Sequence, residues 1–331
     1  MTIGISFYPT GRRRGGQLSA GLLALFFLAG CTTPREASRV DRNVVYGQVG
    51  RKQLVMDIVF PSTGTGPRPV VVNLHGGAWT QGIKSVGTSW LAAPELVRRG
   101  YVFVSIYYRL APRYKFPAQI EDAKCAVRFL RAHAAEYNLD PNRIVAMGSS
   151  SGGHLSALLG TTDASAGFDT SGGWTNESSR VQAVVDLFGH ADLFYAVQHG
   201  ERLRLIARSV FGSKSSEEIL RRASPVTYVT PDDPPFLLVH GEHDGFVPLK
   251  QSELMKAALE KEGVPVELVV VKHAGHCLFA AGGPPTPCSR DLGTMIADFI
   301  DRSLAPSPHE AGTQPAATTN LAAPANSRRT P

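Results

Sequence analysis

The sequence has few cysteines, tryptophans and charged residues, and it lacks repeats and basic stripes. It contains four cysteines and three tryptophans in 331 residues, and 19% of its residues are charged. It has no internal repeat and no basic stripe interleaved with aromatic side chains, which argues against nucleic-acid binding. The formal net charge is +6, but subtracting Arg12, Arg13 and Arg14, in a segment that we expect to be removed, leaves +3. With 43% hydrophobic residues, the chain can bury a full-sized core, and we expect one large domain.

The N-terminal segment lacks an apolar run long enough to span a bilayer comfortably. Arg12 to Arg14 precede the apolar stretch from Leu18 to Ala29, an order typical of a secretory signal. The stretch ends in Leu28-Ala29-Gly30-Cys31, which resembles the bacterial lipobox. This resemblance implies that the cysteine is diacylated and becomes the first residue of the mature protein. The alternatives are a leader with a chance cysteine and an uncleaved anchor.

These features divide the chain into four segments. Residues 1–30 are expected to be a lipoprotein signal peptide, and residues 31–40 a tether behind the lipidated Cys31. Residues 41–304 form the expected folded domain. Residues 305–331 are rich in Pro, Ala and Thr and have no apolar periodicity, which predicts a disordered tail. The expected location is the cell envelope, with the domain held on a membrane by lipid and the choice of membrane left open.

Three further cysteines need an assignment. Cys125 falls in a predicted helix and is expected to be a small buried apolar residue. Cys277 and Cys288 flank a loop rich in glycine and proline, and in an exported protein they are a possible disulfide.

Short apolar runs alternate with helical patterns along the expected domain. The strand-like runs are 54–60, 69–74, 101–107, 143–147, 181–188, 235–239 and 264–271, and the helical patterns are 92–99, 117–137, 152–160, 249–262 and 291–303. This alternation predicts an α/β fold with a mostly parallel sheet flanked by helices. Catalytic groups are then expected at the carboxyl ends of the strands.

The segment Gly148-Ser149-Ser150-Ser151-Gly152 has the pattern G-x-S-x-G between a predicted strand and a predicted helix. In a nucleophile elbow the crowded backbone tolerates little side-chain bulk two residues before and after the serine. Only Ser150 has glycine at both offsets, so the pattern selects it as the nucleophile. The backbone N–H of Ser151 is an expected donor to the oxyanion.

A serine nucleophile needs a base and a carboxylate to orient that base. Asp244 follows a predicted buried strand in His240-Gly241-Glu242-His243-Asp244, and Glu242 is the alternative carboxylate. His276 and its rival His273 follow the last predicted strand. The group from His240 to Asp244 has two histidines but no third convincing metal ligand, so we expect no metal.

The expected oxyanion loop is His75-Gly76-Gly77-Ala78-Trp79, which ends a buried strand. Together with Tyr108-Arg109-Leu110-Ala111-Pro112 and the elbow, this loop resembles the hormone-sensitive-lipase side of the α/β-hydrolases, in the branch of feruloyl-esterase-like enzymes and carboxylesterases. The resemblance spans about residues 44 to 300. It implies that Gly77 and Ala78 donate to the oxyanion, and it favours Asp244 and His276 for the triad.

The resemblance has departures and alternatives. Ala78 stands where many relatives have a third glycine, and Ser151 where alanine is usual; the backbone donors remain in both cases. Residues 190–223 match nothing sharply, and we expect substrate choice to lie there. The function expected is a serine carboxylesterase acting on a small-molecule ester without a cofactor. The alternatives are an arylformamidase-type amidase and a non-catalytic envelope protein on a hydrolase scaffold, and the oligomeric state stays open.

Overall fold

The computed structural model describes residues 37–82, 87–212 and 216–305. Cys31, the expected signal peptide, most of the expected tether and almost all of the expected tail lie outside these residues. None of the helices in the described ranges is both long enough and apolar enough to cross a membrane.

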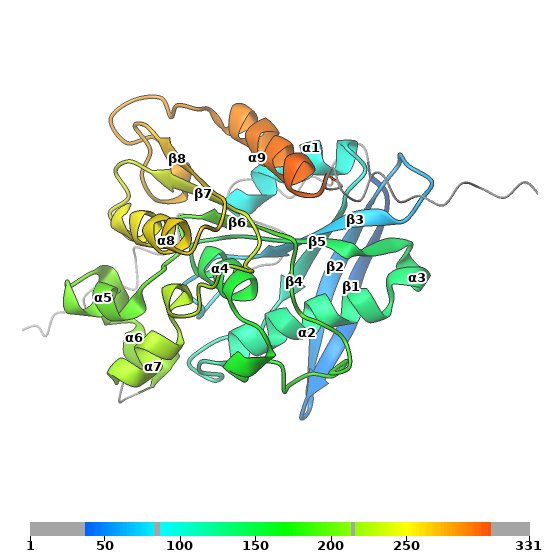
Figure 1. Cartoon of the computed structure of the whole chain (residues 1–331), viewed down its shortest axis with the longest axis horizontal. Coiled ribbons are helices and arrows are strands. Elements are labelled where there is room, and N and C mark those ends of the chain that lie inside the picture. Colours follow the sequence, from blue (N-terminus) through cyan, green and yellow to red (C-terminus); the bar gives the residue numbers. More distant parts are fainter. Residues whose placement is uncertain (1–36, 83–86, 213–215, 306–331) are drawn as a thin grey trace, which may run out of the picture.

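The described residues form one sheet with helices on both faces (Figure 1). The strands are β1 (Ala37–Val49), β2 (Lys52–Pro61), β3 (Arg68–Leu74), β4 (Val102–Tyr107), β5 (Leu139–Ser149), β6 (Ala183–Leu187), β7 (Phe236–Gly241) and β8 (Val266–Val271). The helices are α1 (Ala93–Arg98), α2 (Ala118–Ala132), α3 (Ala134–Tyr137), α4 (Ser151–Thr161), α5 (Leu193–Gln198), α6 (Ala207–Phe211), α7 (Glu217–Arg222), α8 (Lys250–Lys261) and α9 (Ser289–Ser303). Short 3-10 turns lie at η1 (Thr88–Ala92), η2 (Ala164–Ala166), η3 (Arg202–Leu205), η4 (Pro225–Thr227) and η5 (His276–Leu278).

The sheet is mostly parallel, as the sequence predicts. Its strand order is β1-β2-β4-β3-β5-β6-β7-β8. β2 pairs antiparallel with β1 and β4, and the pairs from β4 through β3 to β8 are parallel. Strand β1, an edge strand, is not among the strands predicted from the sequence, and the predicted start of the domain is residue 41. Since β1 begins at Ala37, residues 37–40 belong to the sheet and not to a tether.

Alternating apolar residues in the central strands build two cores, one on each face of the sheet. In β3, Val70 and Val72 face the core that includes α2, α4 and α8, whereas Val71 faces the core that includes α1 and α9. A parallel strand buried on both faces reads as a continuous apolar run, which is why these strands were recognisable in the sequence.

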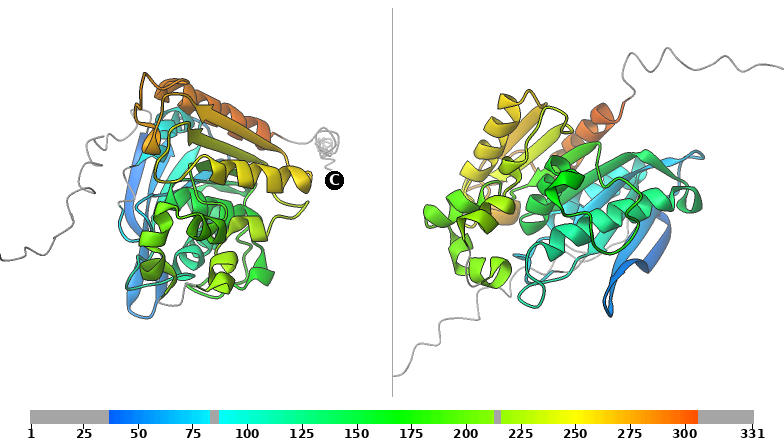
Figure 2. Two further views of the ribbon diagram at one scale, coloured as in Figure 1. Left: turned by 90° about the vertical axis from the view of Figure 1, so that its left-hand side faces the viewer. Right: turned by 60° about the horizontal axis from the view of Figure 1, so that its bottom comes forward.

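The segment between β6 and β7 folds into α5, η3, α6 and α7. These elements gather at one end of the molecule near α8, as Figures 1 and 2 show from three directions. The Gln251 side chain in α8 ties them down, because its Oε1 accepts the backbone N–H groups of Ala191 and Asp192 at 2.9 Å each. The helical pattern predicted for 117–137 is broken at His133 into α2 and α3.

Candidate active site

Three side chains from separate parts of the sheet meet in a line of hydrogen bonds. His276 Nε2 lies 3.2 Å from Ser150 Oγ, and His276 Nδ1 lies 2.7 Å from Asp244 Oδ2. Ser150 follows β5, Asp244 follows β7 and His276 follows β8. The carboxyl ends of adjacent parallel strands lie at one edge of the sheet, so residues 126 and 32 positions apart are brought together.

Ser150 occupies a sharp turn between β5 and α4, at φ 55° and ψ −118°. Its N–H donates to the carbonyl of Leu187 at 2.8 Å, and its carbonyl accepts the N–H of His154 at 3.0 Å. The glycines of the motif are needed because the turn is tight. A Cβ added at Gly152 would lie 2.0 Å from the carbonyl oxygen of Leu74, and one at Gly148 would lie 2.3 Å from the carbonyl oxygen of Gly152.

Asp244 is buried and held as a carboxylate. Its Oδ1 accepts the backbone N–H groups of Phe246 at 2.8 Å and Val247 at 2.9 Å, while Oδ2 faces His276. Burial alone would raise the pKa of Asp244, but hydrogen bonding from His240, His276 and the Val247 backbone outweighs burial and lowers this pKa far below its usual range. Asp244 is therefore charged at neutral pH and favours the proton of His276 on Nδ1.

The expected oxyanion loop, residues 75–79, runs beside the turn at Ser150. A Cβ added at Gly76 would lie 3.5 Å from the Ser150 Cβ, and Gly77 and Ala78 have positive φ values of 121° and 54°. Within the described ranges, no hydrogen bond to a protein group uses the backbone N–H of Gly77, Ala78 or Ser151. The geometry therefore leaves these three donors available to a ligand.

Neighbouring aromatic residues hold the oxyanion loop in place. His75 stacks on Tyr108 with ring centroids 4.2 Å apart, and the Tyr108 hydroxyl donates to the His75 carbonyl at 2.8 Å. Burial lowers the pKa of His75 to about 4, so its ring is neutral at physiological pH. Trp79 Nε1 donates to His154 Nδ1 at 3.2 Å, and His154 Nε2 donates to the carbonyl of Ala223 at 2.7 Å. This chain of bonds joins the loop to α4 and to the segment before β7.

Four further residues close to Ser150, Asp244 and His276 are not among the predicted site residues. Phe188 and Phe246 lie 4.9 and 5.3 Å from the His276 ring between centroids. His240 Nε2 is 2.8 Å from the Val247 carbonyl and 3.5 Å from Asp244 Oδ2, so it stabilises the loop after β7 that carries Asp244. His154 anchors Trp79. In the sequence, the one feature that could have indicated these residues is their position next to a strand end or to the turn at Ser150.

The alternative residues Glu242 and His273 do not take part in the hydrogen bonds that join Ser150, His276 and Asp244. Glu242 and His273 are both exposed, and Glu242 Oε2 accepts the backbone N–H of His273 at 3.1 Å. The structure thus brings Asp244 and His276, not their rivals, to Ser150.

The possible disulfide between Cys277 and Cys288 is not formed. Both thiols are free, and Cys288 Sγ at the start of α9 donates to Asp291 Oδ2 at 3.1 Å. Cys277 is half-buried in the η5 turn, and burial raises the pKa of its thiol to about 11. Cys125 is buried and free, as the sequence predicts.

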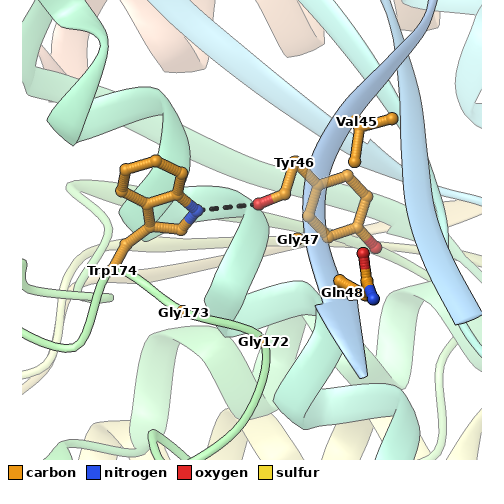
Figure 3. A pocket seen from close by; sticks show the side chains of 7 residues that line it. All are labelled: Val45, Tyr46, Gly47, Gln48, Gly172, Gly173 and Trp174. Carbon is orange, nitrogen blue, oxygen red and sulfur yellow. Dashed lines mark hydrogen bonds between the residues drawn. The ribbon is translucent and has the colours of Figure 1, made fainter. Parts of the chain in front are cut away.

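A cavity of about 390 Å³ is lined by other residues (Figure 3). Its lining comes from β1 and from the loop between η2 and β6: Val45, Tyr46, Gly47, Gln48, Gly172, Gly173 and Trp174. Trp174 Nε1 donates to the Tyr46 carbonyl at 2.9 Å across one wall. None of the triad or oxyanion-loop residues lines this cavity, so we assign it no part in the chemistry.

Comparison with known proteins places the chain in a family. The family model BD-FAE matches residues 56–259. Esterase LipQ of Mycobacterium tuberculosis is 31% identical over 89% of this chain and 69% of LipQ. The probable carboxylic ester hydrolase LipM of the same organism is 33% identical over 73% of this chain and 57% of LipM. The probable isoprenylcysteine alpha-carbonyl methylesterase ICMEL1 of Arabidopsis thaliana is 33% identical, and the chain spans about half of it, 51%.

Solved structures agree with this placement. A truncated carbohydrate esterase from gut microbiota superposes with a TM-score of 0.70 at 28% identity, over 81% of this chain and 97% of that chain. Esterase 2 of Thermogutta terrifontis, phosphonylated by sarin, has a TM-score of 0.67 at 26% identity, over 83% and 98% of the two chains. The mostly parallel eight-stranded sheet and its flanking helices are those of an α/β-hydrolase. The chain therefore belongs to the BD-FAE family of α/β-hydrolases and is a carboxylic ester hydrolase.

Proposed function

We propose that the chain is a serine carboxylesterase that works through an acyl-enzyme. Ser150 Oγ attacks the carbonyl carbon of the ester, and His276 Nε2 accepts the hydroxyl proton. Asp244 stabilises the resulting imidazolium and fixes the proton of His276 on Nδ1. The observation that carries this proposal is the pair of contacts through His276, at 3.2 Å to Ser150 and 2.7 Å to Asp244.

The backbone N–H groups of Gly77, Ala78 and Ser151 are proposed to stabilise the oxyanion of the tetrahedral intermediate. Removal of one such donor typically costs about 3 kcal/mol in the transition state. As the intermediate collapses, the imidazolium gives its proton to the departing alkoxide and the alcohol leaves. Water then attacks the acyl-enzyme with His276 as base, and the carboxylic acid is released while Ser150 regains its proton.

Covalent labelling tests the nucleophile. A fluorophosphonate probe is expected to label wild type stoichiometrically and Ser150→Ala not at all, with p-nitrophenyl acetate hydrolysis lost in parallel. Ser151→Ala is the matched control, because it removes a neighbouring hydroxyl and keeps the backbone donor; it should retain labelling. Equal labelling of Ser150→Ala and wild type would refute the assignment. Turnover of N-formylkynurenine above that of p-nitrophenyl acetate would favour amidase chemistry.

The N-terminal segment supports a second part of the proposal, that Cys31 is lipidated after removal of residues 1–30. The lipobox-like tetrapeptide and the apolar stretch before it are the basis for this statement. Since β1 begins at Ala37, the five residues between the lipid and the sheet span at most about 18 Å. The hydrolase domain would then work close to a membrane surface in the cell envelope.

Fractionation tests the anchor. Cells fed radiolabelled palmitate should yield labelled wild-type protein in the membrane fraction and unlabelled Cys31→Ser protein outside it. Cys288→Ser, which removes an exposed thiol of the folded domain, is the control and should remain labelled. Label retained in Cys31→Ser would rule out lipidation at this residue.

A further inference from the structure

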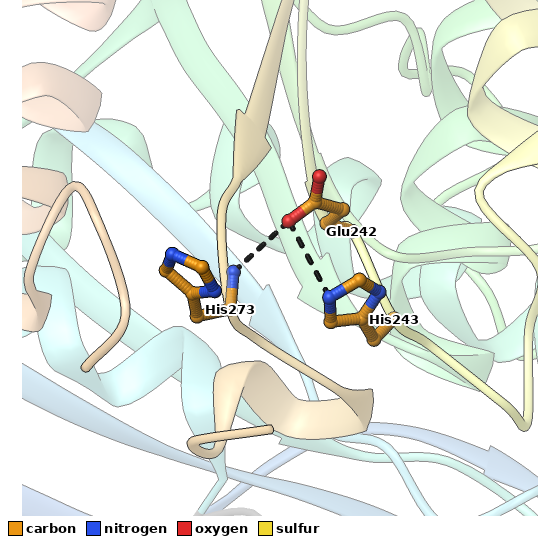
Figure 4. Close-up of side chains that lie close together, drawn as sticks. All are labelled: Glu242, His243 and His273. Carbon is orange, nitrogen blue, oxygen red and sulfur yellow. Dashed lines mark hydrogen bonds and ion pairs between the residues drawn. The ribbon is translucent and has the colours of Figure 1, made fainter. Parts of the chain in front are cut away.

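Two loops at the edge of the active site bring together a carboxylate and two imidazoles that the proposed reaction does not use. Glu242 and His243 follow β7, and His273 follows β8. One ligand atom of each lies within 4.8 Å of the others, and all three side chains are exposed. Figure 4 shows the three side chains close together. This third metal ligand could not be recognised from the sequence, because His273 lies 31 positions away from Glu242.

Backbone hydrogen bonds fix the two loops relative to each other. The N–H of Glu242 donates to the Val271 carbonyl at 3.0 Å, and the N–H of His243 donates to the Ala274 carbonyl at 2.8 Å. His273 itself has a positive φ of 56°, which is uncommon for a residue other than glycine. The ligand groups therefore start from loops that are already joined.

The imidazole rings of His243 and His273 have nitrogen atoms available to coordinate a metal. Within the described ranges, the ring nitrogens of His273 make no hydrogen bond to a protein group. His243 Nε2 lies 3.6 Å from Glu242 Oε2, a contact longer than a good hydrogen bond. Glu242 Oε2 accepts the His273 backbone N–H at 3.1 Å, which leaves Oε1 for another partner.

We propose that Glu242, His243 and His273 bind a divalent transition-metal ion of the Zn²⁺ class. Imidazole nitrogen and carboxylate oxygen suit Zn²⁺ at about 2.0–2.2 Å in tetrahedral geometry, with a fourth position for water. Tetrahedral ligands at that bond length are about 3.4 Å apart. The ligand atoms, which lie within 4.8 Å of one another, therefore need to approach each other by at most about 1.4 Å to close on the ion.

The position of this site defines its effect. His243 directly precedes Asp244, and His273 is three residues before His276. The ion would join the loop of the triad acid to the loop of the triad base without using a nitrogen of His276 or an oxygen of Asp244. Its main effect is to stabilise the folded state, because it binds only when the two loops are together.

Zinc titration of the untagged full-length chain tests the site, with a Cys288→Ser background to remove the exposed thiol as a competing ligand. We expect one saturable Zn²⁺ per chain by calorimetry, and a melting temperature raised by roughly 5 °C at 100 times the dissociation constant. His273→Ala and Glu242→Gln should each weaken binding at least tenfold and abolish most of the rise. His199→Ala removes an exposed histidine elsewhere and should change neither quantity.

Two results would overturn the site: no saturable binding at one ion per chain, or the same affinity in His273→Ala and His243→Ala as in the background protein. Circular dichroism in EDTA should match for all variants, which separates loss of a ligand from loss of the fold. Ser150→Ala should bind Zn²⁺ as the background protein does, so the test does not depend on the esterase mechanism.

Discussion

Replacing Asp244 by asparagine should trap His276 in the wrong tautomer. Asp244 Oδ1 accepts two backbone N–H groups, from Phe246 and Val247. An asparagine NH₂ in that position would face two donors, so its oxygen must occupy the Oδ1 site and its nitrogen the Oδ2 site. That nitrogen would lie 2.7 Å from His276 Nδ1 and donate to it. The remaining proton of the neutral imidazole would then be on Nε2, facing Ser150.

An Nε2 that carries a proton cannot accept the hydroxyl proton of Ser150. For this substitution in serine proteases the loss is about 10⁴-fold in kcat, which corresponds to about 5 kcal/mol of transition-state stabilisation. We expect a loss of this size in Asp244→Asn, measured as kcat on p-nitrophenyl acetate at pH 7.5. Glu242→Gln, a nearby exposed carboxylate without contact to His276, is the matched control and should stay within about twofold in metal-free buffer. If Asp244→Asn retained more than a tenth of the wild-type kcat while folded, the tautomer argument would be refuted.

Three further predictions concern stability. Gly152→Ala places a Cβ 2.0 Å from the last carbonyl of β3, so this variant should lose at least 100-fold in activity or fail to fold. Gly66→Ala, which has open space around it, is the control. Its free energy of unfolding in urea should lie within about 0.5 kcal/mol of the wild-type value. Burial raises the pKa of Asp186 to about 7, above its unfolded value of about 3.9. The stability that Asp186 contributes is therefore intact below pH 4 and is lost as the pH rises through 7. In urea unfolding, the free energy of unfolding of Asp186→Asn relative to wild type should increase by about 1–4 kcal/mol between pH 4 and pH 8, and no increase would contradict the shift. Asp122→Ala leaves the Arg109 guanidinium, paired with Asp122 at 2.7 Å, without its buried partner and should cost about 3 kcal/mol in thermal unfolding, whereas an unchanged melting temperature would show that Glu121 suffices.

The predicted site residues that the structure brings together are those whose position depends on local backbone geometry. Gly148 and Gly152 are readable because any Cβ there meets a carbonyl oxygen within 2.3 Å, whatever the rest of the chain does. Asp244 and His276 could be placed because each follows an apolar run that is buried on the sheet, and parallel strands end at one edge. The register of β7 and β8, with Gly241 opposite Val271, then brings the two loops together.

What the sequence did not reveal depends on contacts between distant segments. Strand β1 is an edge strand in which many residues are partly or fully exposed, so it lacks the apolar run that marked the central strands. The short helices α5 to α7 are fixed by tertiary contacts such as the Gln251 bonds to Ala191 and Asp192. No spacing within one segment indicates that His273 lies beside Glu242.

The strained serine shows how the fold and the proposed chemistry depend on each other. A residue other than glycine held in a sparsely populated backbone conformation, as Ser150 is at φ 55° and ψ −118°, costs on the order of 1–3 kcal/mol. That conformation persists because Ser150 is bonded on both sides, through its N–H to β6 and through its carbonyl to α4. In addition, β5 is buried in both cores and α4 in one of them. The same turn places the Ser150 hydroxyl beside His276 Nε2, and within the described ranges the backbone N–H of Ser151 has no protein acceptor, as the proposed oxyanion site requires. A fold that relaxed the turn would lose both arrangements together, so the strain at Ser150 is a requirement of the proposed site.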